Sequence, residues 1–229
     1  MRNFLRLTFT AIAFLLLTGT FTVETKAQNT IGVVLSRMEE HNKNLTSLRA
    51  NVKMEKYNSQ LDESDLYEGK TTYLPQRGKN PYVRIDWSKP AEESLAVINR
   101  EYIIYRPRLK QVMKGSVDTA KKGAGVNNPL SFINMSRAEL KANYSIKYIG
   151  EETASGVKTW HLELTPKNGN SFKLANIWVD GNGMPVQMKV TEKNNDTTTV
   201  VLSNLDKNST INASVFTINY PKDTKVVKG

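Results

Sequence analysis

The sequence predicts a mainly β protein with a few helices, built on one large antiparallel sheet. Two observations carry this prediction. The spacing of apolar residues changes from a helical period of about 3.6 to a strand period of 2 near Leu48, and turn residues then separate about eleven short strands. The chain has 229 residues, of which 39% are hydrophobic, so one domain with a buried core is expected.

The first 27 residues have the pattern of a secretory signal peptide. Arg2 and Arg6 give a positive start, a largely apolar stretch runs to Val23, and Ala27 is a small residue suited to cleavage. An uncleaved membrane anchor is the alternative, but the apolar centre is short for a span of about 20 residues. We therefore expect cleavage after Ala27 and a single domain over residues 28–229. An exported chain without cysteine suits a bacterial periplasm.

An amphipathic helix of about five turns is expected next. Arg37, Glu39 and Lys43 fall on its polar side. The opposite side is an apolar stripe that consists of Ile31, Val34, Leu35, Met38, Leu45 and Leu48. We expect this stripe to pack on the sheet, either over a permanent core or over a cavity.

Alternation of apolar and polar residues then predicts the strands. Turns such as Asn99-Arg100 and Asp180-Gly181-Asn182-Gly183 separate them. Two apolar runs, 95–98 and 102–105, are expected to be either buried on both faces or strands rich in β-branched residues. The alternating strands are expected at 48–54, 83–87, 144–148, 160–164, 177–179, 186–190 and 200–202.

A second helical element is expected to interrupt the sheet midway. A loop rich in glycine and lysine begins at Gly115, and Pro129 suits the first turn of a helix that runs through Leu140. Together with the first helix, this element predicts a lid. The lid residues are expected to be Val34, Leu35, Met38, Leu130, Phe132 and Ile133.

Composition excludes several kinds of active site. Without cysteine there is no disulfide, thiolate metal site or cysteine nucleophile. The two histidines, His41 and His161, are expected on the surface of the first helix and on the polar side of a strand. No catalytic or phosphate-binding motif stands out, so neither an enzyme activity nor a metal or cofactor is expected. Nucleic acid binding is also not expected in an exported chain, despite the net charge of +10.

The large sheet predicts a binding function. Large antiparallel sheets curl, and a curled sheet of this strand number can hold an apolar ligand. A normally filled sandwich is the alternative. The residues expected to line the cavity are Val52, Met54, Val83, Ile85, Trp87, Val97, Ile104, Trp160, Leu162, Trp178 and Met188, although the sequence does not fix which strand face points inward.

The most basic segment follows the second of the two apolar runs. It contains Arg106, Arg108, Lys110 and Lys114. These residues either face a membrane or an acidic partner, or form a solvated loop and edge strand in which lysines discourage aggregation.

A series of short motifs follows in order along the chain. They are Asn44-Leu45-Thr46-Ser47-Leu48-Arg49-Ala50-Asn51-Val52, Glu68-Gly69-Lys70, Asn80-Pro81-Tyr82-Val83-Arg84-Ile85-Asp86-Trp87, Leu95 to Pro107, Leu109-Lys110-Gln111-Val112, Leu162 to Lys167, and Val215 to Lys222. In their order and spacing these motifs resemble the LolA-type periplasmic carriers of outer-membrane lipoproteins. The resemblance covers nearly all of residues 30–227.

The resemblance implies an unclosed antiparallel β-barrel of about eleven strands, with a helical lid over an apolar cavity. It also implies a monomeric periplasmic carrier that shields the acyl chains of lipid-modified proteins. Such a carrier takes them from an inner-membrane exporter to an outer-membrane acceptor. A carrier of free lipids on the same fold, and a lipoprotein-sensing interaction module in an envelope-stress pathway, are the alternatives.

Two positions depart from the family pattern. Asn80 stands where the family has an arginine that is thought to latch the lid, and Asn99-Arg100 replaces the usual Asp-Gly turn. Lid control and cargo are therefore expected to differ more than the fold.

Overall fold

The computed structural model describes residues 22–76, 80–117, 129–168 and 172–229. Most of the expected signal peptide lies outside these residues. Residues 22–27 belong to the first helix. Cleavage of the leader stays a prediction.

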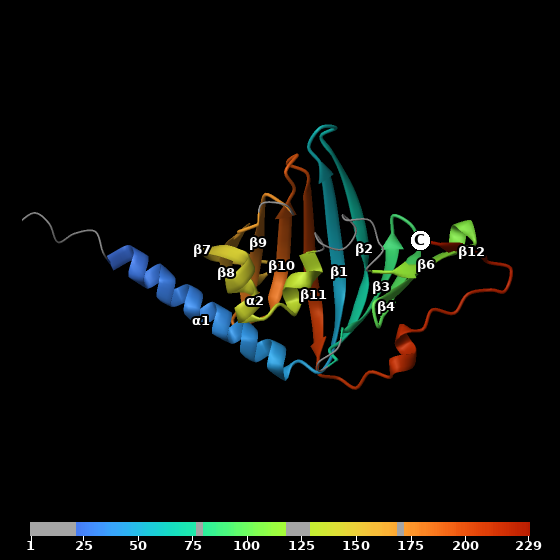
Figure 1. The fold of residues 1–229 in the computed structure, drawn as a ribbon, viewed down its shortest axis with the longest axis horizontal. Coiled ribbons are helices and arrows are strands. Elements are labelled where there is room, and N and C mark those ends of the chain that lie inside the picture. The colour runs from blue at the N-terminus through green and yellow to red at the C-terminus, as the bar shows by residue number, and fades with distance from the viewer. Residues whose placement is uncertain (1–21, 77–79, 118–128, 169–171) are drawn as a thin grey trace, which may run out of the picture.

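Twelve strands form one sheet (Figure 1). The strands are β1 (Leu48–Asn58), β2 (Glu63–Leu74), β3 (Tyr82–Lys89), β4 (Glu93–Ile98), β5 (Glu101–Arg106), β6 (Gln111–Ser116), β7 (Tyr144–Ala154), β8 (Val157–Pro166), β9 (Leu174–Asp180), β10 (Pro185–Thr191), β11 (Thr197–Lys207) and β12 (Lys225–Lys228).

The order of the strands in the sheet is β12-β6-β5-β4-β3-β2-β1-β11-β10-β9-β8-β7. All neighbouring strands are antiparallel except β12, which runs parallel to β6. The two end strands, β12 and β7, do not pair with each other, so the sheet stays open. The expected fold class, an unclosed antiparallel barrel, is confirmed; the short parallel β12 was not predicted.

The turns that separate the strands follow their sequence signals. Asn99 and Arg100 both have positive φ, of 50° and 70°, which suits the tight two-residue connection between β4 and β5. Asp180 accepts hydrogen bonds from the backbone N–H groups of Asn182 and Met184 through Oδ1, at 2.9 and 2.8 Å. This carboxylate therefore shapes the β9–β10 turn.

The helices lie on one face of the sheet, which we call the inner face (Figure 1). They are α1 (Thr22–Asn44) and α2 (Arg137–Asn143), together with the 3₁₀ helix η2 (Pro129–Ile133). A second helical element does interrupt the sheet between β6 and β7, as predicted, but it is divided into η2 and α2, because Ser136 begins a new helix. Its side chain accepts from the Glu139 N–H, while the Glu139 carboxylate accepts from the Ser136 N–H.

The β9–β10 turn holds α1 in place. The Arg37 guanidinium donates a hydrogen bond to the Gly181 carbonyl at 2.6 Å and lies 5.2 Å from the centre of the Trp160 ring. Gly183 has φ of 86°, and a Cβ there would lie 2.2 Å from the Arg37 carbonyl oxygen. Only glycine lets the turn approach the helix backbone this closely.

The C-terminal segment, residues 208–224 between β11 and β12, covers the other face of the sheet over β3–β6. We call this face the outer face. The 3₁₀ helix η3 (Ala213–Phe216) packs on β3 and β4. The Arg84 guanidinium donates to the carbonyl oxygens of Val215 and Thr217, at 2.6 and 3.2 Å. The same side chain also pairs with Asp86. A short 3₁₀ helix, η1 (Pro107–Leu109), connects β5 to β6.

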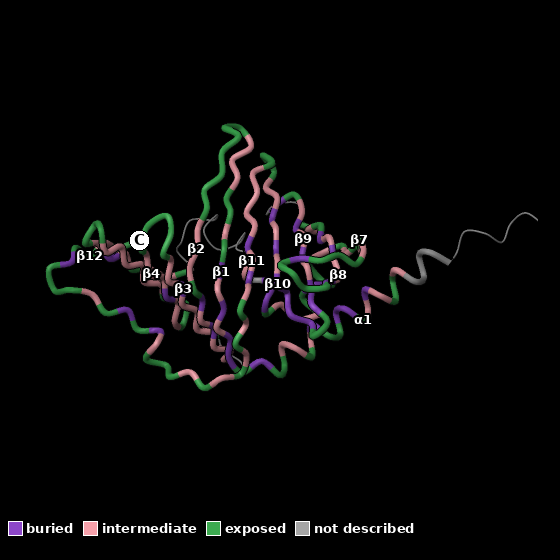
Figure 2. The backbone as a smooth tube through the Cα atoms, turned by 180° about the vertical axis from the view of Figure 1, so that it is seen from behind, coloured by how far each residue is buried: buried purple, intermediate pink, exposed green. Residues whose placement is uncertain are grey.

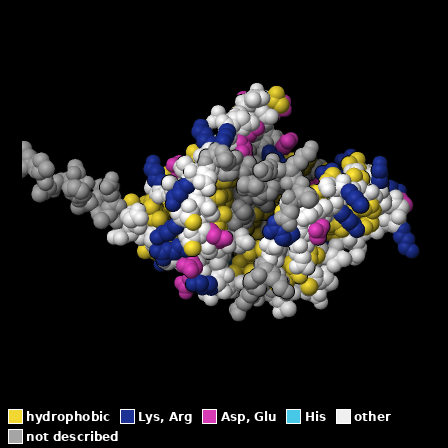
Figure 3. Space-filling model, in the orientation of Figure 1, with side chains coloured by type: hydrophobic (Ala, Val, Ile, Leu, Met, Phe, Trp, Pro, Cys, Tyr) yellow, Lys and Arg dark blue, Asp and Glu magenta, His cyan; other side chains and the backbone are white. Residues whose placement is uncertain are grey.

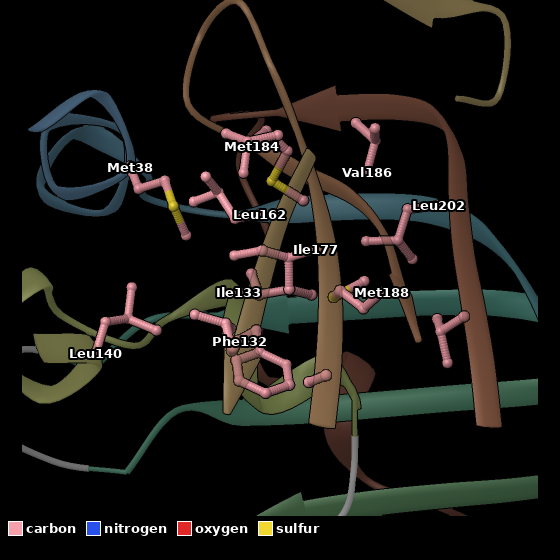
Figure 4. Packing of buried hydrophobic residues seen from close by; sticks show 14 of the residues in the cluster. Met38, Phe132, Ile133, Leu140, Leu162, Ile177, Met184, Val186, Met188 and Leu202 are labelled. Atoms are coloured by element: carbon pink, nitrogen blue, oxygen red, sulfur yellow. The ribbon is translucent and has the colours of Figure 1, made fainter. Parts of the chain in front are cut away.

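The core lies between the helices and the inner face of β1 and β8–β11. Figure 4 shows apolar side chains from α1, η2, α2 and these strands pointing toward one another. Leu35, Leu140 and Ile177 are fully buried there. Each contributes roughly 1.5–3 kcal/mol to folding by leaving water.

Candidate functional site: an open apolar half of the inner face

The inner face divides into two halves that differ in burial. The closed half comprises the inner side chains of β1 and β8–β11, against which the helices pack. Leu162, Ile177 and Met188 have exposures of 0% there. The open half comprises the half-buried apolar inner side chains of β3–β6; Ile85 of β3 shares this face but is buried with the core. Figure 2 shows buried residues gathered on the strands of the closed half and intermediate ones on β3 and β4.

The open half is apolar but only half-buried. Register places its residues side by side across four strands: Val83 is opposite Val97, Val97 opposite Tyr102, and Ile104 opposite Met113. Figure 3 shows hydrophobic side chains exposed on this side of the molecule. The half-buried inner side chains of these strands are Val83, Trp87, Leu95, Val97, Tyr102, Ile104 and Met113.

The outer face of the same strands is closed by the chain itself. Ala96 and Val112 point outward and are buried beneath the C-terminal segment, where Phe216 and Ile218 are also buried. The runs 95–98 and 102–105 thus have cover on the outer side and less cover on the inner side. This explains why their sequence is apolar at nearly every position.

Most residues expected to line the cavity lie on the inner face, as their register shows. Val83, Trp87, Val97 and Ile104 belong to the open half, and Met54 lies at its margin, half-buried. The others are core residues with little or no exposed surface: Val52, Ile85, Leu162 and Met188. Trp160 is half-buried at the contact with α1.

The expectation for Trp178 needs correction, because this residue lies on the outer face. It sits opposite His161 in the β8–β9 register, while the neighbouring Leu162–Ile177 pair points into the core. Its ring stacks on the His161 ring, with centres 4.4 Å apart, and its Nε1 donates to the Glu152 carboxylate at 2.7 Å. His161 lies on the polar side of its strand, as predicted.

His41 differs from its expected place on the surface. It is half-buried at the end of α1, and its Nε2 has no hydrogen-bond partner. Burial, and then the positive charge of Lys207, lower the pKa of His41. Within the described residues no group of three or more histidine, aspartate and glutamate side chains could hold a metal ion.

The residues expected to form a lid all pack against the core. Val34, Leu35 and Met38 are buried along α1, and Phe132 and Ile133 are buried in η2. Leu130 is half-buried. These residues cover the closed half and stop short of β3–β6. That these residues act as a lid stays a prediction.

The seam between the two halves is built around Tyr73 of β2. Its hydroxyl is hydrogen-bonded to the Asn134 side chain, next to η2. Burial raises the pKa of Tyr73 to about 12. Beside it, a cavity of about 620 Å³ opens between the end of α1 and the β2–β3 connection, with Leu45, Pro75 and Pro81 among its walls.

Much of the basic segment is engaged with its own chain. Arg106 pairs with Glu93 at 2.6 Å, Lys110 pairs with Asp223 at 2.9 Å, and the Lys114 ammonium lies 5.3 Å from the centre of the Tyr220 ring. Arg108 is exposed. The Arg106–Glu93 pair joins β5 to β4, whereas the contacts of Lys110 and Lys114 fasten the C-terminal segment beside β6.

Sequence reasoning missed three residues of the open half: Leu95, Tyr102 and Met113. Leu95 and Tyr102 share the strand parity of Val97 and Ile104, which were predicted. Because the runs that contain them are apolar at nearly every position, the sequence does not show which of their residues point inward. Gly115 offers a further signal, because the Tyr102 ring lies where a Cβ of residue 115 would be.

Comparison with known proteins identifies the family to which this chain belongs. The family model described as outer membrane lipoprotein carrier protein LolA matches residues 76–219, more than half of the chain. The chain belongs to the LolA family. The match includes the open half and, as far as residue 219, the C-terminal segment that covers the outer face of the same strands.

A curated relative supports the assignment. The outer-membrane lipoprotein carrier protein of Cupriavidus pinatubonensis is 29% identical over 143 residues, which are 62% of this chain and 63% of the relative. The alignment thus spans less than two thirds of that protein. This chain shares the family and the fold of such proteins.

Solved structures share the fold at low identity. A protein from Thermus thermophilus has a TM-score of 0.56 and 14% identity, and the match covers 87% of this chain and 99% of that one. A MucB structure has a TM-score of 0.58 and 11% identity, over 83% of this chain and 63% of that one. In the MucA/MucB complex of Pseudomonas aeruginosa the TM-score is 0.51, with 13% identity and the same 83% of this chain, against 61% of that one.

Proposed function

We propose that this protein carries lipid-modified proteins through the periplasm, with their acyl chains held against the open half. One observation supports this most strongly. Seven apolar inner side chains of β3–β6, those of the open half, are only half-buried, although the outer face of the same strands is closed by the C-terminal segment. Family membership supports the same role.

Acyl chains fit this surface for physical reasons. Each methylene that leaves water contributes about 0.8 kcal/mol, so one long chain supplies ample affinity without any chemical step. Met113 and Trp87 can contact acyl chains of different shape, because methionine and aromatic side chains repack readily. No catalytic residue is needed for such a carrier.

Transfer requires that the cargo can leave. The helices α1 and η2 lie on the closed half, next to the open half, and besides their apolar packing α1 is held by polar contacts such as Arg37 to Gly181. A small shift of these helices changes the cover over the acyl chains. In this proposal an inner-membrane exporter loads the protein and an outer-membrane acceptor unloads it by binding the cargo more tightly.

The test is to purify the protein from a periplasmic extract and identify bound molecules by native mass spectrometry. Val97→Glu places a charge in the middle of the open half and is expected to abolish loading while the far-ultraviolet circular dichroism stays unchanged. Ile149→Glu is the matched control, because Ile149 is 45% exposed on β7 and lies outside the open half.

Co-purification of acylated polypeptide with the wild-type protein and with Ile149→Glu, but not with Val97→Glu, supports the proposal. Free lipid alone in the wild-type protein favours a carrier of free lipids. Equal loading of all three proteins, or an empty wild-type protein that binds no acyl ligand, contradicts the proposal.

A further inference from the structure

The β1–β2 hairpin extends beyond the neighbouring strand β3 and leaves part of β2 at a free edge. β2 begins at Glu63, but its pairing with β3 begins only at Glu68, opposite Lys89. Among the described residues, Glu63–Tyr67 therefore have a strand neighbour on the β1 side only. Such an edge offers unpaired N–H and C=O groups to an incoming strand.

The hairpin is held firmly on its other side. Ser59 at the tip donates its backbone N–H to the Asp196 carboxylate at 2.8 Å and its hydroxyl to the Asn194 carbonyl at 2.6 Å, both in the β10–β11 turn. The Tyr57 hydroxyl donates to Asp62 at 2.8 Å. The free edge is thus preorganised, which lowers the entropic cost of pairing with another strand.

Side chains along this edge are acidic and apolar, in a protein with a net charge of +10. From Asp62 to Glu68 the sequence holds four acidic residues and no basic one. In the described part of the chain, Glu63 and Asp65 make no ion pair, and Leu66 is 63% exposed. Figure 3 shows acidic and hydrophobic side chains together at the hairpin tip. The lysines that usually protect an edge are missing from these positions.

Strand geometry sorts these side chains onto two faces. Tyr67 packs on Trp87 of the inner face, so Asp65 and Glu63 point to the same side, while Leu66 points to the other. A strand added beside β2 would therefore place alternate residues next to carboxylates and next to Leu66. Two copies of this edge would bring like charges together, which disfavours self-pairing.

We propose that Glu63–Tyr67 of β2 is a docking edge for an extended polypeptide in which basic and apolar residues alternate. The partner adds a strand to the sheet through backbone hydrogen bonds. Its basic side chains face Glu63 and Asp65, and its apolar side chains face Leu66. Tyr67 contacts Trp87 of the open half, but the proposed strand pairing uses the backbone edge of β2 and not the apolar surface, so it does not depend on the proposed acyl-binding function.

The first test uses a capped octapeptide of alternating lysine and valine. Amide hydrogen exchange at Glu63–Tyr67 is expected to slow when the peptide binds, and fluorescence anisotropy gives its Kd. A peptide of the same composition with a central proline is expected to bind much more weakly, because proline interrupts the ladder. Unchanged exchange at these amides, or equal binding of the proline peptide, overturns the proposal.

Charge variants supply the second test. The double variant Glu63→Lys/Asp65→Lys is expected to weaken binding about tenfold or more, and Glu63→Gln/Asp65→Asn less. Glu40→Lys/Glu151→Lys is the matched control, with the same change in net charge at exposed positions elsewhere. If both double lysine variants weaken peptide binding equally, the effect is due to net charge alone and the proposed docking edge is refuted. Acyl loading by native mass spectrometry should be unaffected in every variant.

Discussion

The two halves of the inner face share the same alternating pattern of apolar residues but differ in the segments that are packed on them. Both present apolar side chains at alternate strand positions, yet those of β8–β11 are buried under helices and those of β3–β6 are half-buried. The chain covers the inner side of one half and, with its C-terminal segment, the outer side of the other. Alternation in a strand therefore shows that a face is apolar, but the elements packed on it decide whether it becomes core or binding surface.

Truncating one leucine in each half tests this difference most strongly. Leu162→Ala in the closed half is expected to lower the free energy of unfolding by about 2–5 kcal/mol, because it leaves a cavity in a packed core. Leu95→Ala in the open half is expected to cost about 1 kcal/mol or less, since Leu95 is only half-buried. Urea unfolding measures both values.

The two variants are expected to affect lipid binding in the reverse order to their effect on stability. Leu95→Ala is expected to weaken binding of a fluorescent fatty acid, and Leu162→Ala to leave it nearly unchanged wherever the protein stays folded. Equal losses of stability in the two variants would show that the open half is packed as tightly as the core.

A substitution in the β9–β10 turn, which holds α1, is expected to lower stability by a smaller amount within the closed half. Gly183→Ala is expected to destabilise the protein by about 3 kcal/mol, because the positive φ is strained for alanine and the new Cβ meets the α1 backbone. Faster amide exchange along α1 is expected with it. Gly181→Ala is the control in the same turn, since a Cβ there meets nothing within 4 Å.

If Gly183→Ala leaves amide exchange in α1 as slow as in the wild type, the turn does not hold the helix. If Gly181→Ala costs as much as Gly183→Ala, the effect belongs to turn flexibility and not to contact with α1.

The sequence predicted the fold well where periodicity was the only information needed. The stripe with Val34, Leu35 and Met38 is the buried side of α1, and the alternation in β8 and β10 placed Leu162 and Met188 in the core. Family motifs predicted the open barrel. The parallel strand β12 was missed, because a four-residue strand has too few residues to show a period.

The candidate site was harder to predict, because it depends on contacts between distant segments. Trp178 looked like a lining residue, but only the pairing of β8 with β9 shows that it shares the outer face with His161. The half-burial of Val97 and Ile104 depends on which segments cover each side of β4 and β5. No local pattern encodes that cover.

The seam at Tyr73 gives the smallest and most selective prediction. Burial raises its pKa to about 12, above the ordinary value of 10.0 for an unfolded chain, so folding favours the protonated phenol. The stabilisation is fully present below pH 10 and is lost as the pH rises through about 12. A shift of this size corresponds to roughly 2–3 kcal/mol in the free energy of unfolding.

Urea unfolding between pH 9 and 12 measures this loss, and Tyr73→Phe is the informative variant. It removes the titrating group and the hydrogen bond to Asn134, but keeps the ring between the two halves. Its stability is expected to fall less steeply with pH than that of the wild type. Tyr144 also has a pKa raised by burial, so some slope should remain in Tyr73→Phe. Identical slopes in the two proteins would mean that the seam opens before Tyr73 loses its proton, and that the halves separate more easily than the burial of this ring implies.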